Sequence, residues 1–123
     1  MDIERFREEC LMLPYAEESL PFGDDLLVFK VKGRIFAILP LDEDEPSVSL
    51  KCDPDRCEEL RAHYDAVIPG YHLNKRHWNS VYLERDLPAD QILHLIRHSY
   101  DLVVAKLPKA VRLELQDQVP ISK

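Results

Sequence analysis

Apolar residues recur along the chain with two different periods, one typical of α-helices and one typical of β-strands. Behind Asp2, a residue that favours helix N-caps, apolar side chains are spaced three or four positions apart until Pro14 interrupts the pattern. This spacing predicts an amphipathic helix over residues 3–12, whose Arg and Glu residues form a solvated face.

Two apolar runs rich in β-branched and aromatic residues follow an acidic connector at residues 15–25, which contains Pro and Gly. The runs, residues 26–31 and 34–39, are separated only by Lys32-Gly33, and such a polar-Gly step predicts a tight β-hairpin. Residues 47–52 then alternate polar and apolar side chains, as in a third strand with one buried face.

The second half of the chain contains two more helical patterns and two strand candidates. Asp53-Pro54 combines an N-cap residue with Pro at the first helical position, which predicts a helix to about His63. Residues 71–74 are a short strand candidate and residues 78–83 a clearer one. A wide apolar stripe over residues 89–107 predicts a long final helix that Pro108 ends, and residues 110–123 are either a short strand-like tail or disordered.

The predicted element order is α-β-β-β-α-β-β-α. Short connections make the strands antiparallel, so we expect an α+β two-layer sandwich with an antiparallel sheet and its helices on one face. The length of 123 residues fits one domain, assigned to residues 1–115, with a C-terminal tail at 116–123.

Charge and cysteine content narrow the class of protein. Sixteen basic and 23 acidic residues give a net charge of −7, which opposes non-specific attraction to DNA or anionic lipid. No apolar run approaches the roughly 20 residues of a membrane helix, and the acidic N-terminus is unlike a secretory signal. We therefore expect a cytoplasmic protein, with a monomer favoured. Cys10, Cys52 and Cys57 lack zinc-site spacing and are expected to be reduced thiols.

Catalytic and cofactor patterns are weak throughout the sequence. The three glycines are isolated, so they form no phosphate-binding loop, and no nucleophile stands in a known catalytic motif. His94 and His98 have helical i, i+4 spacing but lack the Glu of a metalloprotease motif, and the acidic loop at 42–45 lacks the ligand spacing of a calcium loop. We expect no enzyme activity, no metal and no cofactor.

Segment 70–79 is dense in hydrogen-bond donors and aromatic side chains. Lys75 and Arg76, with an imidazole and amides beside them, are suited to phosphate contacts. Tyr71 and Trp78 either stack on nucleic-acid bases or anchor the loop to the core, and composition favours anchoring for the Trp.

The chain resembles the MmcQ/YjbR-like family of small bacterial proteins. Segment 69–79 (PGYHLNKRHWN) looks like the family's central signature, and segment 96–103 (IRHSYDLV) looks like its C-terminal helix motif. Segments 20–23 (LPFG) and 32–37 (KGRIFA) also fit, so the similarity extends to about residue 115.

The resemblance implies a CyaY-like or secretion-chaperone-like fold and a DNA-binding role, attributed to a double-wing arrangement of the sheet and its loops. Carried over to this sequence, that role points to Lys75, Arg76, His77 and Asn79, and also to the hairpin cations Lys30, Lys32 and Arg34.

Two hypotheses follow. The first is a DNA-binding protein that contacts phosphates with these loop and hairpin cations. The alternative is a protein- or peptide-binding module of the secretion-chaperone type, with no nucleic-acid role, that offers a sheet edge or groove to its partner. In the second case Asn79 and Ser99 would serve to satisfy buried backbone groups.

Overall fold

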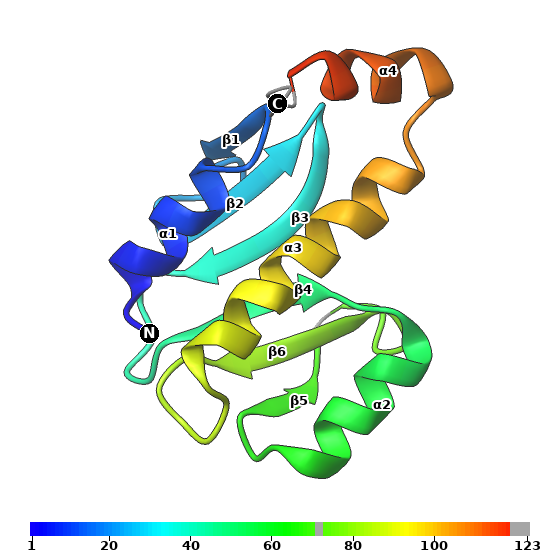
Figure 1. Cartoon of the computed structure of the whole chain (residues 1–123). Helices are drawn as coiled ribbons and strands as arrows, with labels where there is room; N and C mark the ends of the chain where they lie inside the picture. The colour runs from blue at the N-terminus through cyan, green and yellow to red at the C-terminus, as the bar shows by residue number, and fades with distance from the viewer. Residues whose placement is uncertain (71–72, 119–123) are drawn as a thin grey trace.

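Six antiparallel strands form one sheet, in the spatial order β1-β2-β3-β4-β6-β5 (Figure 1). The computed structural model describes residues 1–70 and 73–118. The strands are β1 (Ala16–Ser19), β2 (Leu26–Val31), β3 (Arg34–Pro40), β4 (Ser47–Lys51), β5 (Val67–Pro69) and β6 (Trp78–Tyr82).

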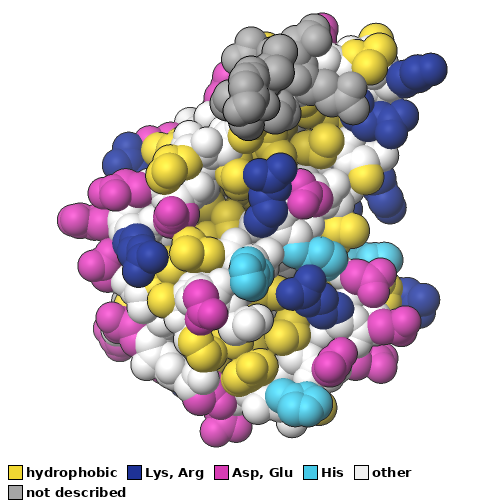
Figure 2. Space-filling model, in the orientation of Figure 1, with side chains coloured by type: hydrophobic (Ala, Val, Ile, Leu, Met, Phe, Trp, Pro, Cys, Tyr) yellow, Lys and Arg dark blue, Asp and Glu magenta, His cyan; other side chains and the backbone are white. Residues whose placement is uncertain are grey.

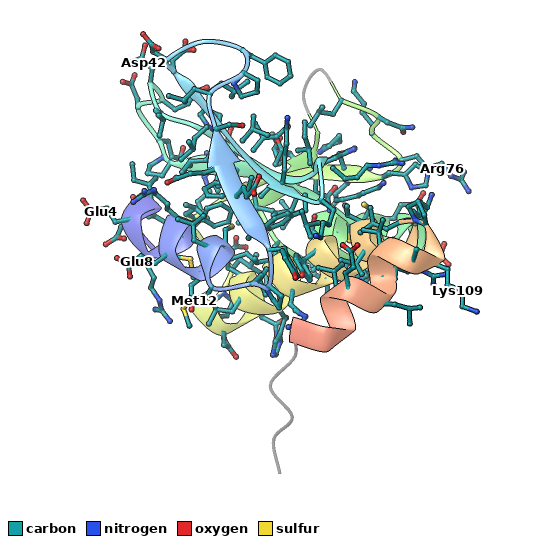
Figure 3. The ribbon with its side chains drawn as sticks, turned by 90° about the horizontal axis from the view of Figure 1, so that it is seen from above. Glu4, Glu8, Met12, Asp42, Arg76 and Lys109 are labelled. Carbon is teal, nitrogen blue, oxygen red and sulfur yellow. The ribbon has the colours of Figure 1, made fainter. Side chains whose placement is uncertain are left out.

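Over the described residues, four helices complete the fold, and one face of the sheet is covered by none of them. They are α1 (Ile3–Leu11), α2 (Pro54–His63), α3 (Ala89–Ala105) and α4 (Lys109–Gln118). The long helix α3 crosses β3 and β4, with α1 beside it, and α1, α3 and α4 lie on the same side of the sheet (Figures 1 and 3). We call the opposite side of the sheet the open face. Within the described part of the chain, no helix has both the length and the apolar character needed to cross a membrane.

Strand alternation separates the core from the open face. Phe29 pairs with Ala37, Ala37 with Leu50, and all three are buried in the cluster that the helices cover. A large apolar side chain such as Phe29 or Leu50 contributes about 1.5–3 kcal/mol when it is removed from water, so this face supplies most of the stability. The next row along the strands, in which Ile38 pairs with Ser49, points to the open face.

The predicted tight hairpin is confirmed. Lys32 and Gly33 connect β2 to β3 with backbone φ values of 49° and 81°. Two consecutive positive φ values are typical of a type I′ turn, whose twist matches that of the flanking strands. This turn fixes the register in which Val31 faces Arg34.

The α+β class, the antiparallel sheet and the helices at 3–11, 54–63 and 89–105 agree with the sequence-based prediction. Two elements were missed. The acidic connector contains β1, which pairs with β2 along its whole length although its sequence has no apolar alternation. The tail contains α4, because Val111 and Leu115 are covered four residues apart while Leu113 between them is 49% exposed. The prediction of a short strand-like or disordered tail was therefore wrong for the residues of α4.

The predicted short strand at 71–74 is also not where expected. Residues 71 and 72 lie outside the described residues, and 73 and 74 are not part of a strand. The strand beside β6 is instead β5, which ends at Pro69.

Candidate nucleic-acid interface

Antiparallel strands place alternate loops at opposite ends of the sheet, and here this separates the charges. One end carries the loops at 20–25, 41–46, 64–66 and 83–88, with nine acidic residues and one basic residue, Arg85. The acidic residues are Asp24, Asp25, Asp42, Glu43, Asp44, Glu45, Asp65, Glu84 and Asp86. We call this the acidic end.

The loops at the opposite end have the reverse balance. They span 12–15, 32–33, 52–53, 70–77 and 106–108 and carry four basic residues and one acidic residue, Asp53. Arg34 begins β3 and Lys51 ends β4 at this same end. Figure 3 shows Arg76 and Lys109 on the side of the molecule away from Asp42. We call this the basic end, defined by Arg34, Lys51, Lys75, Arg76 and Lys106.

The helix side of the molecule shows a weaker form of this separation. Lys and Arg side chains gather over α4 and the C-terminal part of α3, whereas Asp and Glu side chains line the edge formed by α1 (Figure 2). Over α2, by contrast, side chains of both signs lie together, so the separation on this side is partial.

Three cations of the basic end lie close enough to repel one another. Burial and then the neighbouring charges of Lys106 and Arg34 lower the pKa of Lys51 below the usual value for lysine. These residues come from β4, the C-cap of α3 and β3, so only the packing of α3 over the two strands brings them together. Such repulsion is relieved when an anion binds.

Hydrogen bonds to Asn74 fix the turn that carries Lys75 and Arg76. The Asn74 carbonyl accepts hydrogen bonds from the backbone N–H groups of His77 and Trp78 at 3.1 and 2.9 Å, and the Asn74 side chain accepts one from Arg76 N–H at 3.0 Å. These bonds leave the side chains of Lys75 and Arg76 exposed. His77 is half-buried, and its carbonyl accepts a bond of 2.7 Å from the Cys52 N–H.

Arg61 of α2 attaches this loop to the core, a role that the sequence analysis missed. Its Nε donates to Asn79 Oδ1 at 2.7 Å, and its terminal nitrogen donates to the carbonyls of Lys75 and, at 3.3 Å, Trp78. Asn79 is only 2% exposed. The prediction that Asn79 contacts a nucleic acid is therefore corrected: its amide holds Arg61 inside the fold, because buried polar groups require partners.

The predicted hairpin cations have different environments. Lys32 is neutralised, since its Nζ lies 3.0 Å from Glu114 and 3.8 Å from the centre of the Tyr15 ring. Arg34 is exposed, and Lys30 is half-buried. Of the three, Arg34 is therefore the most available to a ligand at the basic end.

Trp78 supplies an aromatic surface beside these charges. It pairs across the strands with Lys51, and both side chains are half-buried. Both alternate with the buried Leu50 and Asn79, so by strand parity they belong to the open face. Gly70 packs directly against this Trp, because a Cβ on Gly70 would lie 2.9 Å from the Trp78 Cβ. Tyr71, the other predicted stacking residue, lies outside the described residues.

The other candidate residues have structural roles. Ser99 Oγ donates to the Phe36 carbonyl at 2.5 Å and accepts from Lys51 N–H at 2.9 Å, which confirms that it satisfies buried backbone groups. His98 Nε2 accepts a bond of 3.2 Å from Asp53 N–H, while His94 is exposed. Among residues 1–70 and 73–118, no group of three or more His, Cys, Asp or Glu side chains is placed to hold a metal ion.

The cysteines are free, as predicted. Cys10, Cys52 and Cys57 are all buried, and burial is the largest cause that raises the pKa of the Cys52 thiol, to about 12. A buried thiol with a raised pKa is unreactive.

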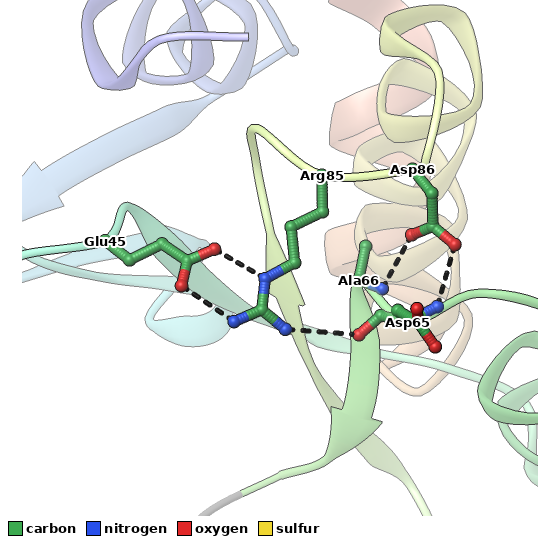
Figure 4. A network of polar contacts seen from close by, with 5 residues as sticks. All are labelled: Glu45, Asp65, Ala66, Arg85 and Asp86. Atoms are coloured by element: carbon green, nitrogen blue, oxygen red, sulfur yellow. Dashed lines mark hydrogen bonds and ion pairs between the residues drawn. The ribbon is translucent and has the colours of Figure 1, made fainter.

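The cation at the acidic end is engaged by neighbours (Figure 4). Arg85 donates to both carboxylate oxygens of Glu45, at 2.5 and 2.7 Å, and to the Asp65 carbonyl at 3.4 Å. Asp86 accepts from the N–H groups of Asp65 and Ala66 at 2.9 and 2.8 Å, and these backbone hydrogen bonds lower the pKa of its carboxyl. Arg85 therefore offsets one negative charge, that of Glu45, and the other acidic residues of this end keep it strongly negative.

Comparison with known proteins identifies the family. The sequence pattern of the YjbR family matches residues 11–102, which is most of the chain. The chain belongs to the YjbR family. The relative named "Uncharacterized protein YjbR" from Escherichia coli (strain K12) is 38% identical over 112 residues, covering 91% of this chain and 95% of that protein.

Solved structures support the same membership of the YjbR family. The Deinococcus radiodurans protein DR2400, with domain DUF419, is similar with a TM-score of 0.86 and 45% identity, over 93% of this chain and 87% of that one. A Pseudomonas syringae protein is similar with a TM-score of 0.74 and 26% identity, over 84% and 99% of the two chains. These names describe the family and the fold, and none of them names a ligand.

Proposed function

We propose that the protein binds DNA without catalysis, through the basic end of its sheet. The observation that carries the proposal is the separation of charge by the antiparallel topology, which gathers Arg34, Lys51, Lys75, Arg76 and Lys106 at one end of an otherwise acidic protein. Four of these five side chains are exposed, and cations gathered on one surface match the closely spaced phosphates of a nucleic acid.

The net charge of −7 does not prevent such contact. The two ends are separated by the length of a strand, and the seven residues of β3 span roughly 20 Å at about 3.3 Å per residue. The Debye length at physiological ionic strength is about 8 Å. Repulsion from the acidic end is therefore largely screened where the phosphates would lie, and it orients the molecule with its basic end toward the DNA.

The contacts divide into two kinds. Lys75 and Arg76 project from a fixed turn and would contact phosphates, which carry affinity but little sequence information. Trp78 and Lys51 pair across neighbouring strands on the open face, both half-buried, and an aromatic ring beside a cation is suited to an unpaired base and its phosphate. A preference for single-stranded or distorted DNA over intact duplex would follow from the use of Trp78.

The sheet edges favour this proposal over recognition of a peptide by strand addition. The edge strand β5 has three residues and ends at Pro69, and the edge strand β1 has four residues that include Glu17 and Glu18. Short edges with Pro or charged residues resist pairing with another chain. The protein- or peptide-binding alternative would therefore have to use the open face rather than an edge.

Fluorescence anisotropy with labelled single-stranded and duplex DNA at about 50 and 200 mM salt tests the proposal. For four or five phosphate contacts, the slope of log affinity against log salt is expected to be about −3 to −4.5. The double variant Lys75→Glu/Arg76→Glu should bind at least tenfold more weakly and reduce the magnitude of the slope by about 2.

A matched control variant distinguishes an effect of the basic end from an effect of the net charge. Arg5→Glu/Arg97→Glu changes the charge by the same amount at two exposed positions away from the basic end. It should retain most of the affinity. Binding that does not depend on salt, or equal losses in the two double variants, would rule out the proposed interface.

A further inference from the structure

The open face contains a cavity that the proposed DNA interface does not use. It has a volume of about 440 Å³ and lies toward the acidic end of the sheet. This volume falls within the usual range for sites of small organic ligands, about 300–1,000 Å³. Its lining residues come from β2, β3, β4 and β6 and from the loops beside them: Phe22, Asp25, Leu26, Ile38, Ser49 and Ser80 among others.

The floor of the cavity is apolar with a row of hydroxyl groups. Leu26 and Ile38 lie on adjacent strands, and the register continues from Ile38 to Ser49 and from Ser49 to Ser80. Phe22 at the rim is 65% exposed, and a phenyl side chain is seldom this exposed to water. An apolar body with one or two polar groups would fit this floor.

The charged groups that line the cavity all have the same sign. Asp25, Asp42 and Glu43 contribute carboxylates, and no Lys, Arg or His of residues 1–70 and 73–118 lines the cavity. The Asp25 carbonyl accepts a bond of 2.8 Å from Leu41 N–H, which fixes the two acidic loops against each other. The carboxylates are nevertheless too dispersed to share a metal ion, since the described residues contain no such cluster.

We infer that this cavity binds a small organic cation with an apolar body, such as a primary amine on an aromatic or aliphatic group. The amine would lie toward the carboxylates, where the negative potential of the acidic end favours positive charge. The apolar body would cover Leu26, Ile38 and Pro40, and the exposed Phe22 ring would add a cation–π or stacking contact. Anions, including nucleic acids, are repelled from this position, so the cavity and the basic end have opposite specificities.

Two-dimensional ¹⁵N–¹H NMR titration with 2-phenylethylamine, and with its neutral analogue 2-phenylethanol, tests the inference. The amine is expected to shift the amide signals of Ile38, Ser49 and Ser80 saturably. The alcohol should bind at least fivefold more weakly, because it keeps the apolar body but lacks the charge. Asp42→Asn/Glu43→Gln should weaken amine binding about five- to tenfold, the range expected for losing two partly exposed ion pairs.

The acidic end offers a matched control. Asp44→Asn/Glu84→Gln removes the same charge from the same end, but these residues do not line the cavity, so amine binding should change less than twofold. Equal affinity for amine and alcohol would overturn the inference, because it would indicate non-specific hydrophobic binding. Equal losses in both double variants would also overturn it, because they would indicate non-specific electrostatic attraction to the acidic end. Shifts of the same signals with protein concentration alone would also overturn it, since they would assign the face to a second copy of the chain.

Discussion

Arg61 is predicted to hold both the core and the loop that carries Lys75 and Arg76 in place. In the variant Arg61→Met, the methylene packing of the side chain is largely kept, but every hydrogen bond of the guanidinium is lost. Asn79 Oδ1 loses its 2.7 Å partner, and the carbonyls of Lys75 and Trp78 lose theirs. Asn79 Nδ2 already lacks a partner among the described residues, so the buried amide would then have neither end satisfied.

The size of the effect follows from burial. Leaving a buried polar group without a partner costs about 1–3 kcal/mol, and Asn79 is 2% exposed. The two carbonyls lie nearer to water and add less. We therefore expect Arg61→Met to lower the free energy of unfolding by about 2 kcal/mol, which corresponds to a fall in Tm of roughly 6–12 °C for a domain near this size.

Urea unfolding followed by circular dichroism measures this loss, and a double-mutant cycle assigns its cause. Asn79→Leu alone strands Arg61, whereas Arg61→Met/Asn79→Leu removes both partners and should recover about 1–2 kcal/mol relative to the sum of the single losses. Arg56→Met, on the same helix and without a hydrogen bond in the described structure, should change stability by less than about 0.5 kcal/mol. If Arg61→Met unfolded at the wild-type midpoint, or the cycle were additive, the anchoring role would be refuted.

Two further predictions concern His98 and Gly70. Burial and then the Arg56 charge lower the pKa of His98 below its unfolded value of about 6.5, so the unfolded state takes up protons first and stability should fall as pH drops from about 7 toward 5. His98→Gln should remove most of this slope, whereas the exposed His94→Gln should keep it; identical pH profiles for all three proteins would contradict the assignment. Gly70→Ala should destabilise by roughly 1–3 kcal/mol in the same urea assay, because its Cβ would meet Trp78, and an unchanged midpoint would show that this contact relaxes freely.

Local sequence patterns were sufficient to predict those helices and turns whose capping or turn residues lie within a few positions of one another. Asp2 caps α1 with a 2.8 Å bond to Arg5 N–H, and Lys32-Gly33 forms the hairpin turn. Such features depend on backbone preferences and near neighbours, which are written in consecutive residues. The element α4 was misread because a three-residue alternation of Val111, Leu113 and Leu115 is compatible with either period until a packing surface selects one.

The candidate site was only half visible in the sequence. Lys75 and Arg76 stand out as neighbours in a polar segment, and they are exposed in the structure. Lys51 and Lys106 do not stand out, because they are 55 positions apart and meet Arg34 only through the crossing of α3 over β3 and β4. Asn79 was misassigned because it lies in a polar segment, and the sequence does not show that its side chain is buried. Its burial depends on the hydrogen bond with Arg61, which comes from α2.

The sequence by itself determined the class of fold, the hairpin and the positions of three helices, because these follow from local periodicity and turn chemistry. Only the tertiary structure decided which charges share a surface. Strand pairing in antiparallel order sends successive loops to opposite ends, and this long-range ordering, which no short segment encodes, turns a mixed set of acidic and basic residues into one acidic and one basic end.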